Sequence, residues 1–393
     1  MVKKFLHFEG LRGVAAFVVL LAHFKPTFCR NINVTILDSL GLLNETTRII
    51  ADNFLKIFYD GSLPVFIFWF MSAFVISIKL FNPERNRDNK YLIEATSKRY
   101  FRLAIPVFFS SLICFILIKT HLFQNSALAE YSGTGYVDGW LNKWYHFDEG
   151  FFNFLKTTLV EVFASGNSNY NTVLWTMSTE LLGSFLCFAL FAIFGKNKFR
   201  FVLYSIIISF LAIAGIREVS YFNYFVFVCG IMWCDVIHSQ DENVYLRKRI
   251  LLVFNSKTFP LLLLLSGFGV TLFSDTIKPL HQTIYYFFNY PIKAIGFTLL
   301  VNNFNFLKNI FSTKPFAFMG KISFSLYLIH IPILFTVGAY LFMYAGFNPE
   351  YKVALVFLIV SVLTILLSYL FTILVDKKSI VISDKVGKYV ANK

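Results

Sequence analysis

The first apolar stretch of the sequence holds two side chains whose types and spacing suit proton transfer. Arg12 and His23 are 11 residues apart, which in an α-helix is about three turns and roughly 16 Å, so they share one face together with Glu9. The neutral imidazole of His23 can accept a proton from a hydroxyl group, as a general base does. A histidine that only hydrogen-bonds to a neighbouring helix is an equally good interpretation of this position alone.

Arg99 and Arg102 form a second group, because residues three apart share a helix face. Guanidinium groups bind phosphate oxygens through paired hydrogen bonds, and the phosphates of coenzyme A are one such ligand. On spacing alone, a charge cluster that orients the chain in the membrane, or one that contacts lipid headgroups, is the simpler interpretation.

Glu180 lies shortly after Trp175 and Ser178, at the start of a long apolar run. Ser178 or Thr176 can cap this helix, and a carboxylate in the first turn suits the helix dipole, so a structural role explains the acidic residue well. In the functional interpretation, Glu180 faces inward and is a partner for His23 or for an acceptor hydroxyl.

Tyr327 and His330 share a helix face further along the chain. A buried hydrogen-bonding role suits each of them better than direct catalysis. The five cysteines form no CxxC pair and give no indication of a metal site. P-loop, HExxH and GxSxG patterns do not occur in the sequence, which argues against nucleotide hydrolases, metalloproteases and serine hydrolases.

The elements that carry these residues are predicted to be membrane spans. Hydrophobic residues make up 57% of the 393 residues and charged residues only 15%, which is too apolar for a soluble chain of this length. A membrane-crossing helix needs roughly 20 mostly apolar residues. The fold class is therefore predicted as all-α, a polytopic transmembrane bundle of about ten helices. The predicted spans are 6–24, 54–80, 103–123, 173–194, 201–216, 221–238, 258–274, 284–302, 322–344 and 352–375.

Basic residues set the predicted orientation. The net charge of +14 would suit nucleic acid binding, but about two thirds of the Lys and Arg residues fall in segments that face the cytoplasm if the N-terminus does. Both termini are therefore predicted to be cytoplasmic, and no nucleic acid partner is expected. A single membrane domain is predicted for residues 1–380, followed by a short basic cytoplasmic tail, 381–393. In the longest outside segment, residues 151–163 have the spacing of a short interfacial helix.

The order of the motifs resembles the acyltransferase-3 family of integral-membrane O-acyltransferases, of the O-antigen and polysaccharide acetyltransferase kind, over about residues 5–378. Glu9-Gly10-Leu11-Arg12-Gly13 with His23 is similar to the family's (D/E)-G-L-R-G opening and R-x10-H spacing, and Arg99 with Arg102 is similar to its R-x-x-R. Three more segments resemble the second-helix pattern ending in S-G-F, the W-S-L-S-x-E pattern and the G-x-x-S-Y-S-L-Y-L-x-H pattern; they are residues 64–74, 175–180 and 320–330.

Three positions depart from the family's pattern. Ala73 stands where the family usually has Gly, which is expected to loosen close helix packing. Phe324 stands where the family usually has Tyr, which removes one hydroxyl. Residues 375–378 follow the family's E-K/R-P only loosely, so no site is assigned there.

The resemblance implies a membrane-bound O-acyltransferase, most often an O-acetyltransferase. Such an enzyme moves the acyl group of cytoplasmic acetyl-CoA, or of another acyl-CoA, to a hydroxyl of a cell-surface polysaccharide or lipid-linked sugar. The expected location is the plasma (inner) membrane of a bacterium, in contact with membrane lipids, and no metal is expected. In this hypothesis Arg12, Arg99 and Arg102 hold the coenzyme A phosphates, while His23 deprotonates the acceptor beside Glu180. Transfer through an acyl-histidine at His23 is an open alternative.

Two other functions fit parts of the sequence. A glycolipid or polysaccharide transporter or flippase would also use ten spans and intramembrane charges, although the internal repeats and paired interrupted helices typical of transporters are not evident. An acyltransferase acting on a cytoplasmic small-molecule sugar would keep the chemistry and change the acceptor. The position of the acceptor site separates these functions.

Overall fold

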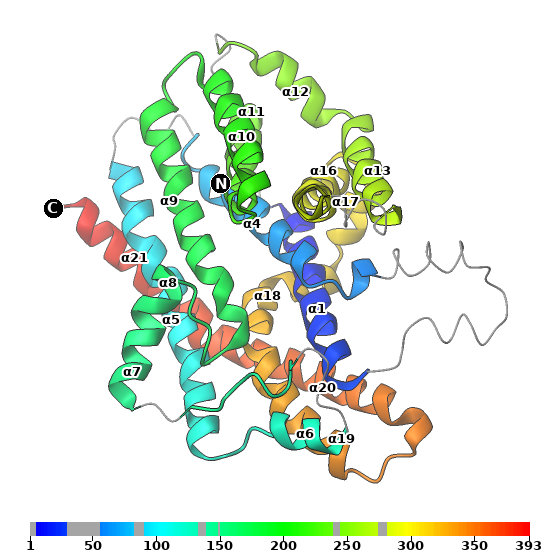
Figure 1. Ribbon diagram of the computed structural model, residues 1–393. Helices are drawn as coiled ribbons and strands as arrows, with labels where there is room; N and C mark the ends of the chain where they lie inside the picture. The colour runs from blue at the N-terminus through cyan, green and yellow to red at the C-terminus, as the bar shows by residue number, and fades with distance from the viewer. Residues whose placement is uncertain are drawn as a thin grey trace.

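The computed structural model describes residues 5–29, 56–81, 90–132, 139–147, 150–238, 244–273 and 281–393. Every regular element within these ranges is a helix (Figure 1). Seven of the described helices are long and apolar enough to cross a membrane, or eight if one bent pair forms a single span. The predicted fold class, a polytopic helical membrane protein, is therefore confirmed. The side of the membrane on which the termini lie stays a prediction.

Short 3₁₀ and π segments, labelled η, precede or interrupt the α-helices. Four of them, η2, η4, η5 and η6, are single π-helical turns within longer helical stretches, a feature frequently found near functional sites. In chain order the elements are α1 (Leu6–Phe28), η1 (Lys56–Phe58), α4 (Ser62–Ser77), α5 (Lys90–Lys119), α6 (Asn125–Tyr131), α7 (Phe151–Lys156), η2 (Thr157–Glu161), α8 (Val162–Ala164), η3 (Thr172–Trp175), α9 (Thr176–Phe194), α10 (Arg200–Arg217), α11 (Tyr221–His238), α12 (Arg247–Asn255), α13 (Thr258–Leu272), α15 (Gln282–Phe287), η4 (Phe288–Ile292), α16 (Lys293–Asn303), α17 (Asn305–Phe311), α18 (Lys314–Ile333), η5 (Leu334–Gly338), α19 (Ala339–Tyr344), α20 (Pro349–Phe371), η6 (Thr372–Asp376) and α21 (Lys377–Ala391).

Each predicted span coincides with helix, but several bounds differ from the prediction. α4 has only 16 residues, and the eighth predicted span is divided among α15, η4 and α16. α5 begins at Lys90, so Arg99 and Arg102 lie inside this helix rather than at its entrance. The predicted interfacial segment is helical through α7, η2 and α8. Residues 54, 55 and 274 of the predicted spans lie outside the described residues.

α1 and α18 lie side by side and run parallel, and glycines let their backbones approach closely. A Cβ atom on Gly320 would lie 2.1 Å from the backbone oxygen of Glu9, and one on Gly13 would lie 2.6 Å from the backbone nitrogen of Gly320. Small residues at such contacts allow membrane helices to pack tightly. Gly13 and Gly320 are 307 residues apart, as are His23 and His330 on the same two helices. The glycine contact therefore sets the register that brings the two histidines together.

The helix of His330 is interrupted just after the histidine. Pro332 has no backbone N–H, so the carbonyl of Leu328 lacks its usual helical partner. The side chain of Asn171 donates a hydrogen bond to this carbonyl at 2.8 Å, and the chain continues as the π-helical turn η5. The segment that precedes α9 is thereby attached to α18 beside the histidine.

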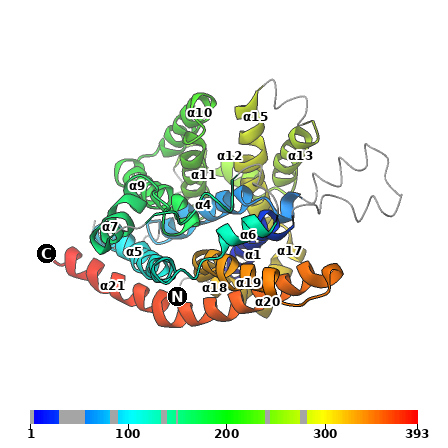
Figure 2. The same ribbon diagram turned by 60° about the horizontal axis from the view of Figure 1, so that its bottom comes forward.

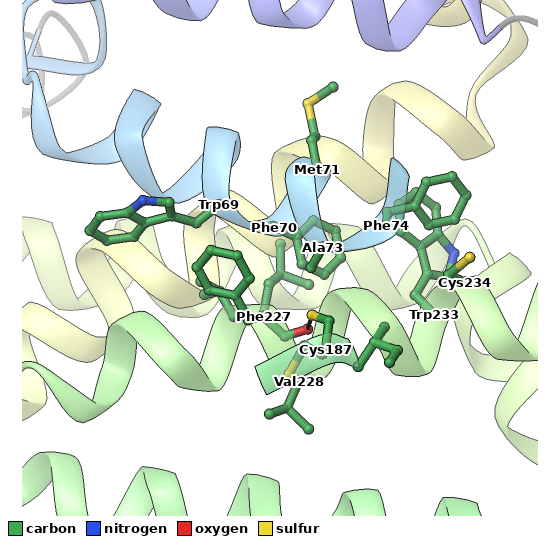
Figure 3. Packing of buried hydrophobic residues seen from close by; sticks show 14 of the residues in the cluster. Trp69, Phe70, Met71, Ala73, Phe74, Cys187, Phe227, Val228, Trp233 and Cys234 are labelled. Carbon is green, nitrogen blue, oxygen red and sulfur yellow. Dashed lines mark hydrogen bonds between the residues drawn. The ribbon is translucent and has the colours of Figure 1, made fainter. Parts of the chain in front are cut away.

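Aromatic residues fill the contact between α4 and α11 (Figure 3). The Trp233 ring stacks on Phe70 with centroids 5.3 Å apart and meets Phe74 at 4.3 Å. A Cβ atom on Gly230 of α11 would lie 2.7 Å from the Cβ of Ala73 on α4. The loosening expected from Ala73 is therefore wrong for this contact, because the opposite helix supplies the glycine that allows close approach.

α21 continues the chain beyond α20 and η6 and packs along α5 (Figures 1 and 2). Lys98 of α5 bonds to Asp384 at 3.0 Å, and a Cβ atom on Gly387 would lie 2.8 Å from the backbone oxygen of Glu94. Residues 381–391, expected in the basic tail, are thus helical and packed against a long helix. The division of the chain at residue 380 stays a prediction.

Gly320→Ala is expected to destabilise the protein by about 1–3 kcal/mol or more, because the added methyl group forces two backbones apart. The apparent midpoint of thermal unfolding of the detergent-purified protein measures the effect. Gly269→Ala is the matched control, since a Cβ atom there meets nothing within 4 Å and Ala is the better helix former. Equal midpoints for Gly320→Ala and the wild type would contradict the close contact.

Candidate active site

Three arginines from two sequence motifs meet in one cavity between α1, α4, α5, α9 and α18. This space, the arginine cavity, has a volume of about 220 Å³. Its polar lining side chains are Arg12, Trp69, Ser72, Arg99, Arg102, Thr176, Glu180, Ser323 and Tyr327. The remaining lining side chains are apolar. The cavity therefore combines three cationic side chains with largely apolar walls.

Arg99 is held by an ion pair with Glu180 of α9. Ser72 of α4 also donates to the Glu180 carboxylate, and the Arg99 Nε atom donates to Ser184 at 2.8 Å. The network joins α4, α5 and α9 around one buried charge. The structure therefore corrects the suggestion that Glu180 pairs with His23, because its Oε1 atom bonds to Arg99 and Ser72 and Glu180 lines the arginine cavity, which His23 does not line.

Arg102 has a carboxylate partner from the other end of the chain. Its Nη1 atom bonds to Asp376 at 2.6 Å and to the Ser379 hydroxyl at 2.8 Å, and its guanidinium lies 5.6 Å from the Phe324 ring. Phe324 thus offers Arg102 an aromatic face for a cation–π contact, which the absence of the tyrosine hydroxyl does not remove. Asp376 was not assigned to a site from sequence, although a carboxylate at the end of a long apolar stretch is a usable signal.

Arg12 is the arginine that lacks such a partner. No residue within the described ranges forms a hydrogen bond or ion pair with its guanidinium, whereas Arg99 and Arg102 each have a carboxylate. The arginine cavity therefore carries one positive charge in excess. An anionic group that enters it is expected to bind at Arg12, because that guanidinium has free donors.

A second cavity, the histidine cavity, lies next to the first. It has a volume of about 430 Å³, and its polar lining side chains are His23, Tyr59, Asp60, Ser62, Trp175 and Tyr327. Val65 and Tyr327 line both cavities. The two cavities are therefore neighbours that share these two side chains, with the arginines in one and His23 in the other.

His23 and His330 form a hydrogen-bonded pair beside the histidine cavity. The Nδ1 atom of His330 lies 3.0 Å from the backbone oxygen of Leu326, which only accepts, so neutral His330 carries its proton on Nδ1. Its Nε2 atom then accepts from the Nδ1 atom of His23 at 3.1 Å, and the same His23 donor lies 2.9 Å from the Val19 oxygen. His23 is left with an unprotonated Nε2 atom, which is the form that a general base requires.

An aromatic residue that was not predicted covers the His23 ring. Trp140 stacks on it with centroids 5.4 Å apart, and the Trp140 indole nitrogen donates to the Thr27 hydroxyl at 3.2 Å. Trp140 comes from the segment between α6 and α7, more than 100 residues from His23 in the sequence. No spacing rule within one helix could have identified this contact.

Asp60 is a carboxylate in the histidine cavity that the sequence interpretation also missed. Its Oδ1 atom accepts the backbone N–H of Ser62 at 3.0 Å. A smaller cavity beside it is lined by Lys293, which is 3% exposed and donates to Asn289 at 2.6 Å. Both charged residues fall within predicted spans, so the rule that intramembrane charges indicate function would have identified them.

The remaining candidates occupy different places. Trp175 lines the histidine cavity, and its indole is 45% exposed and meets Trp69 edge-on at 6.1 Å. Ser178 and Glu9 line neither cavity. Ser178 donates to the backbone oxygen of Trp175 at 3.3 Å, and Glu9 presents its backbone to Gly320.

Comparison with known proteins agrees with the motifs. The sequence profile of the acyltransferase-3 family, described as an acyltransferase domain, matches residues 5–373. The O-acetyltransferase PaAT-1 of Phomopsis amygdali is 23% identical over 398 residues, which cover 86% of this chain and 74% of that protein. No solved structure matches the chain.

Glu180→Gln is expected to lower stability by about 3–5 kcal/mol, because it leaves the buried Arg99 charge without its carboxylate. Thermal unfolding of the purified protein measures this effect. Glu161→Gln is the control: Lys156 lowers the pKa of the Glu161 carboxyl, but this pair is open to solvent and screened. Losses of stability of similar size in the two variants would show that the Arg99–Glu180 pair stabilises the protein no more than the solvent-exposed pair does.

Proposed function

The chain belongs to the acyltransferase-3 family of membrane O-acyltransferases, and from this premise we propose that it transfers an acyl group, most simply acetyl, from a cytoplasmic acyl-CoA to a hydroxyl of a cell-surface polysaccharide or lipid-linked sugar. The observation that carries this proposal is the pair of neighbouring cavities, one with the arginines and one with His23. Such an arrangement can hold an anionic donor on one side and an acceptor on the other.

The donor occupies the arginine cavity. Arg12 offers free guanidinium donors to a phosphate group, and Arg102 can exchange Asp376 for another anion. Arg99 stays paired with Glu180 and contributes positive charge from a fixed position. Because Arg12 is near the start of α1, a cytoplasmic N-terminus places this cavity toward the cytoplasm, where acyl-CoA is available.

The acceptor occupies the histidine cavity, where His23 acts as the base. The Nε2 atom of His23 takes the proton of the acceptor hydroxyl while the hydroxyl oxygen attacks the thioester carbonyl carbon. The carbon–sulfur bond then breaks, the ester remains on the acceptor, and the proton passes from the imidazolium to the thiolate of coenzyme A. The hydrogen bond from His23 to His330 keeps the required tautomer in place.

The acceptor class rests on the lining of the histidine cavity. Tyr59, Asp60 and Ser62 offer hydroxyl and carboxylate groups, and Trp175 offers an exposed aromatic face. A few polar groups placed among aromatic walls suit a polyhydroxylated ligand. The relative named as an O-acetyltransferase supports acetyl as the acyl group. The proposal locates the enzyme in the plasma membrane of a bacterium.

His23→Gln is expected to lower acyl transfer by about 10²- to 10⁴-fold, because glutamine cannot take the hydroxyl proton. Membranes that contain equal amounts of each variant are incubated with acetyl-labelled acetyl-CoA, and label is counted in surface polysaccharide, lipid and soluble fractions. His281→Gln is the control, since His281 is exposed and lines neither cavity. Binding of acetyl-CoA to the purified His23→Gln protein should be retained.

Three other results of this labelling experiment would each contradict a different part of the proposed function. Equal incorporation by the wild type and His23→Gln would remove His23 from the mechanism. Label in soluble small molecules alone would replace the surface acceptor by a cytoplasmic one. No label in any fraction, together with no binding of acetyl-CoA, would favour a glycolipid transporter over an acyltransferase.

Arg12→Gln is expected to raise the KM for acetyl-CoA by about 10- to 100-fold, because a hydrogen bond to a charged group contributes about 1.5–3 kcal/mol. The turnover number should change less, since Arg12 is distant from the reacting carbonyl. Arg217→Gln, an exposed arginine at the end of α10, is the control. An unchanged KM in Arg12→Gln would exclude Arg12 from donor binding.

A further inference from the structure

Two side chains separate the anion-binding side of the site from the base. Val65 of α4 and Tyr327 of α18 are the residues common to the linings of the arginine cavity and the histidine cavity. A group that passes from one cavity to the other has to pass between or beside them. The conformational freedom of Val65 and Tyr327 therefore limits the size of a group that can pass between the cavities.

Tyr327 is held on both sides of this boundary. Its hydroxyl donates to the backbone oxygen of Val173 at 2.8 Å and lies 2.9 Å from the Thr176 hydroxyl. Val173 lines the histidine cavity and Thr176 lines the arginine cavity. The side chain is 5% exposed, and a change of its χ1 rotamer would move the hydroxyl and break two buried hydrogen bonds, which is unfavourable.

Val65 is equally restricted for a different reason. It lies inside α4, where a β-branched side chain has one strongly preferred rotamer. It is 5% exposed, and close-packed neighbours leave such a side chain little room to adapt. The boundary between the two cavities is therefore formed by the held ring of Tyr327 and by the two methyl groups of Val65.

We infer that Val65 and Tyr327 form a size filter for the acyl group, which admits acetyl and excludes bulkier or branched acyl groups. This inference rests on the proposed function, because it assumes a donor thioester in the arginine cavity. The acyl group is the end of the donor, so it meets Val65 and Tyr327 at this boundary when its carbonyl approaches His23. A wider group meets Val65 before the carbonyl is in reach.

The expected selectivity between acetyl and isobutyryl groups can be estimated from the selectivity of other apolar pockets. A difference of one methylene in an apolar pocket changes selectivity by about 10- to 200-fold. Isobutyryl differs from acetyl by two methyl groups on the carbon next to the carbonyl, at the place where the filter acts. Val65→Ala removes two methyl groups from the wall and should compensate for most of this difference.

The test measures dissociation constants of coenzyme A, acetyl-CoA and isobutyryl-CoA for the purified full-length protein in detergent. Dividing each thioester constant by that of coenzyme A isolates the contribution of the acyl group. For the wild type, isobutyryl-CoA is expected to bind at least 10-fold more weakly than acetyl-CoA. In Val65→Ala this gap should close to within about threefold.

Two further variants keep the result interpretable. Val107→Ala makes the same change at a fully buried site that lines neither cavity, and should leave the gap as in the wild type. Val65→Ile adds a methylene to the wall and should weaken acetyl-CoA relative to coenzyme A. If Val65→Ala does not fold, the Val65→Ile result decides the question.

Three outcomes overturn the inference. Equal affinity of the wild type for acetyl-CoA and isobutyryl-CoA would show that no filter exists. A gap that persists in Val65→Ala, or closes equally in Val107→Ala, would place the selection elsewhere. Failure of coenzyme A and both thioesters to bind the wild type would reject the proposed function, whereas binding of all three without discrimination rejects the filter alone.

Discussion

The backbone contact between α1 and α18 is the constraint on which the site depends. Gly13 and Gly320 allow the two helices to touch, and the helices then run parallel from the arginines to the histidines. Because an α-helix turns by about 100° per residue, a slip of one position would rotate His23 away from His330. Within α1 itself, the spacing of 11 residues places Arg12 roughly 16 Å from His23, and the two side chains line different cavities.

Charge pairing in an apolar interior explains the rest of the arrangement. Water cannot solvate Arg99 and Arg102 fully, so each is joined to a carboxylate from another helix, Glu180 or Asp376. These pairs also connect α5 to α9 and to η6, which fixes the walls of the arginine cavity. Among the described residues, Arg12 has no hydrogen-bond or ion-pair partner for its guanidinium. Two arginines thus connect the helices around the cavity, and the third lines it without such a connection.

The sequence predicted the features that depend on neighbouring residues, and it did not predict contacts between residues that are far apart in the chain. Hydropathy identified the helical segments, and helical spacing placed Arg12 and His23 on one face, because both depend on neighbours within a few turns. The partners of the site residues come from segments far away in the chain: Asp376 for Arg102, His330 for His23 and Trp140 over the imidazole. Glu180 was recognised as a candidate, but its partner depended on how α5 and α9 pack. The length of α4 was overestimated because apolar residues continue beyond the ends of the helix.

The separation of His23 from His330 also determines when the site can form during synthesis. Membrane proteins are made from the N-terminus, and α1 is inserted long before α18 leaves the ribosome. Until then, the imidazole on α1 has no partner to set its tautomer, and the glycine face of α1 remains open to lipid or to other helices. An interrupted chain that ends before α18 would thus carry the histidine and arginines without any assembled cavity. Because Tyr327 of α18 lines both cavities, neither cavity is complete until this helix has been made.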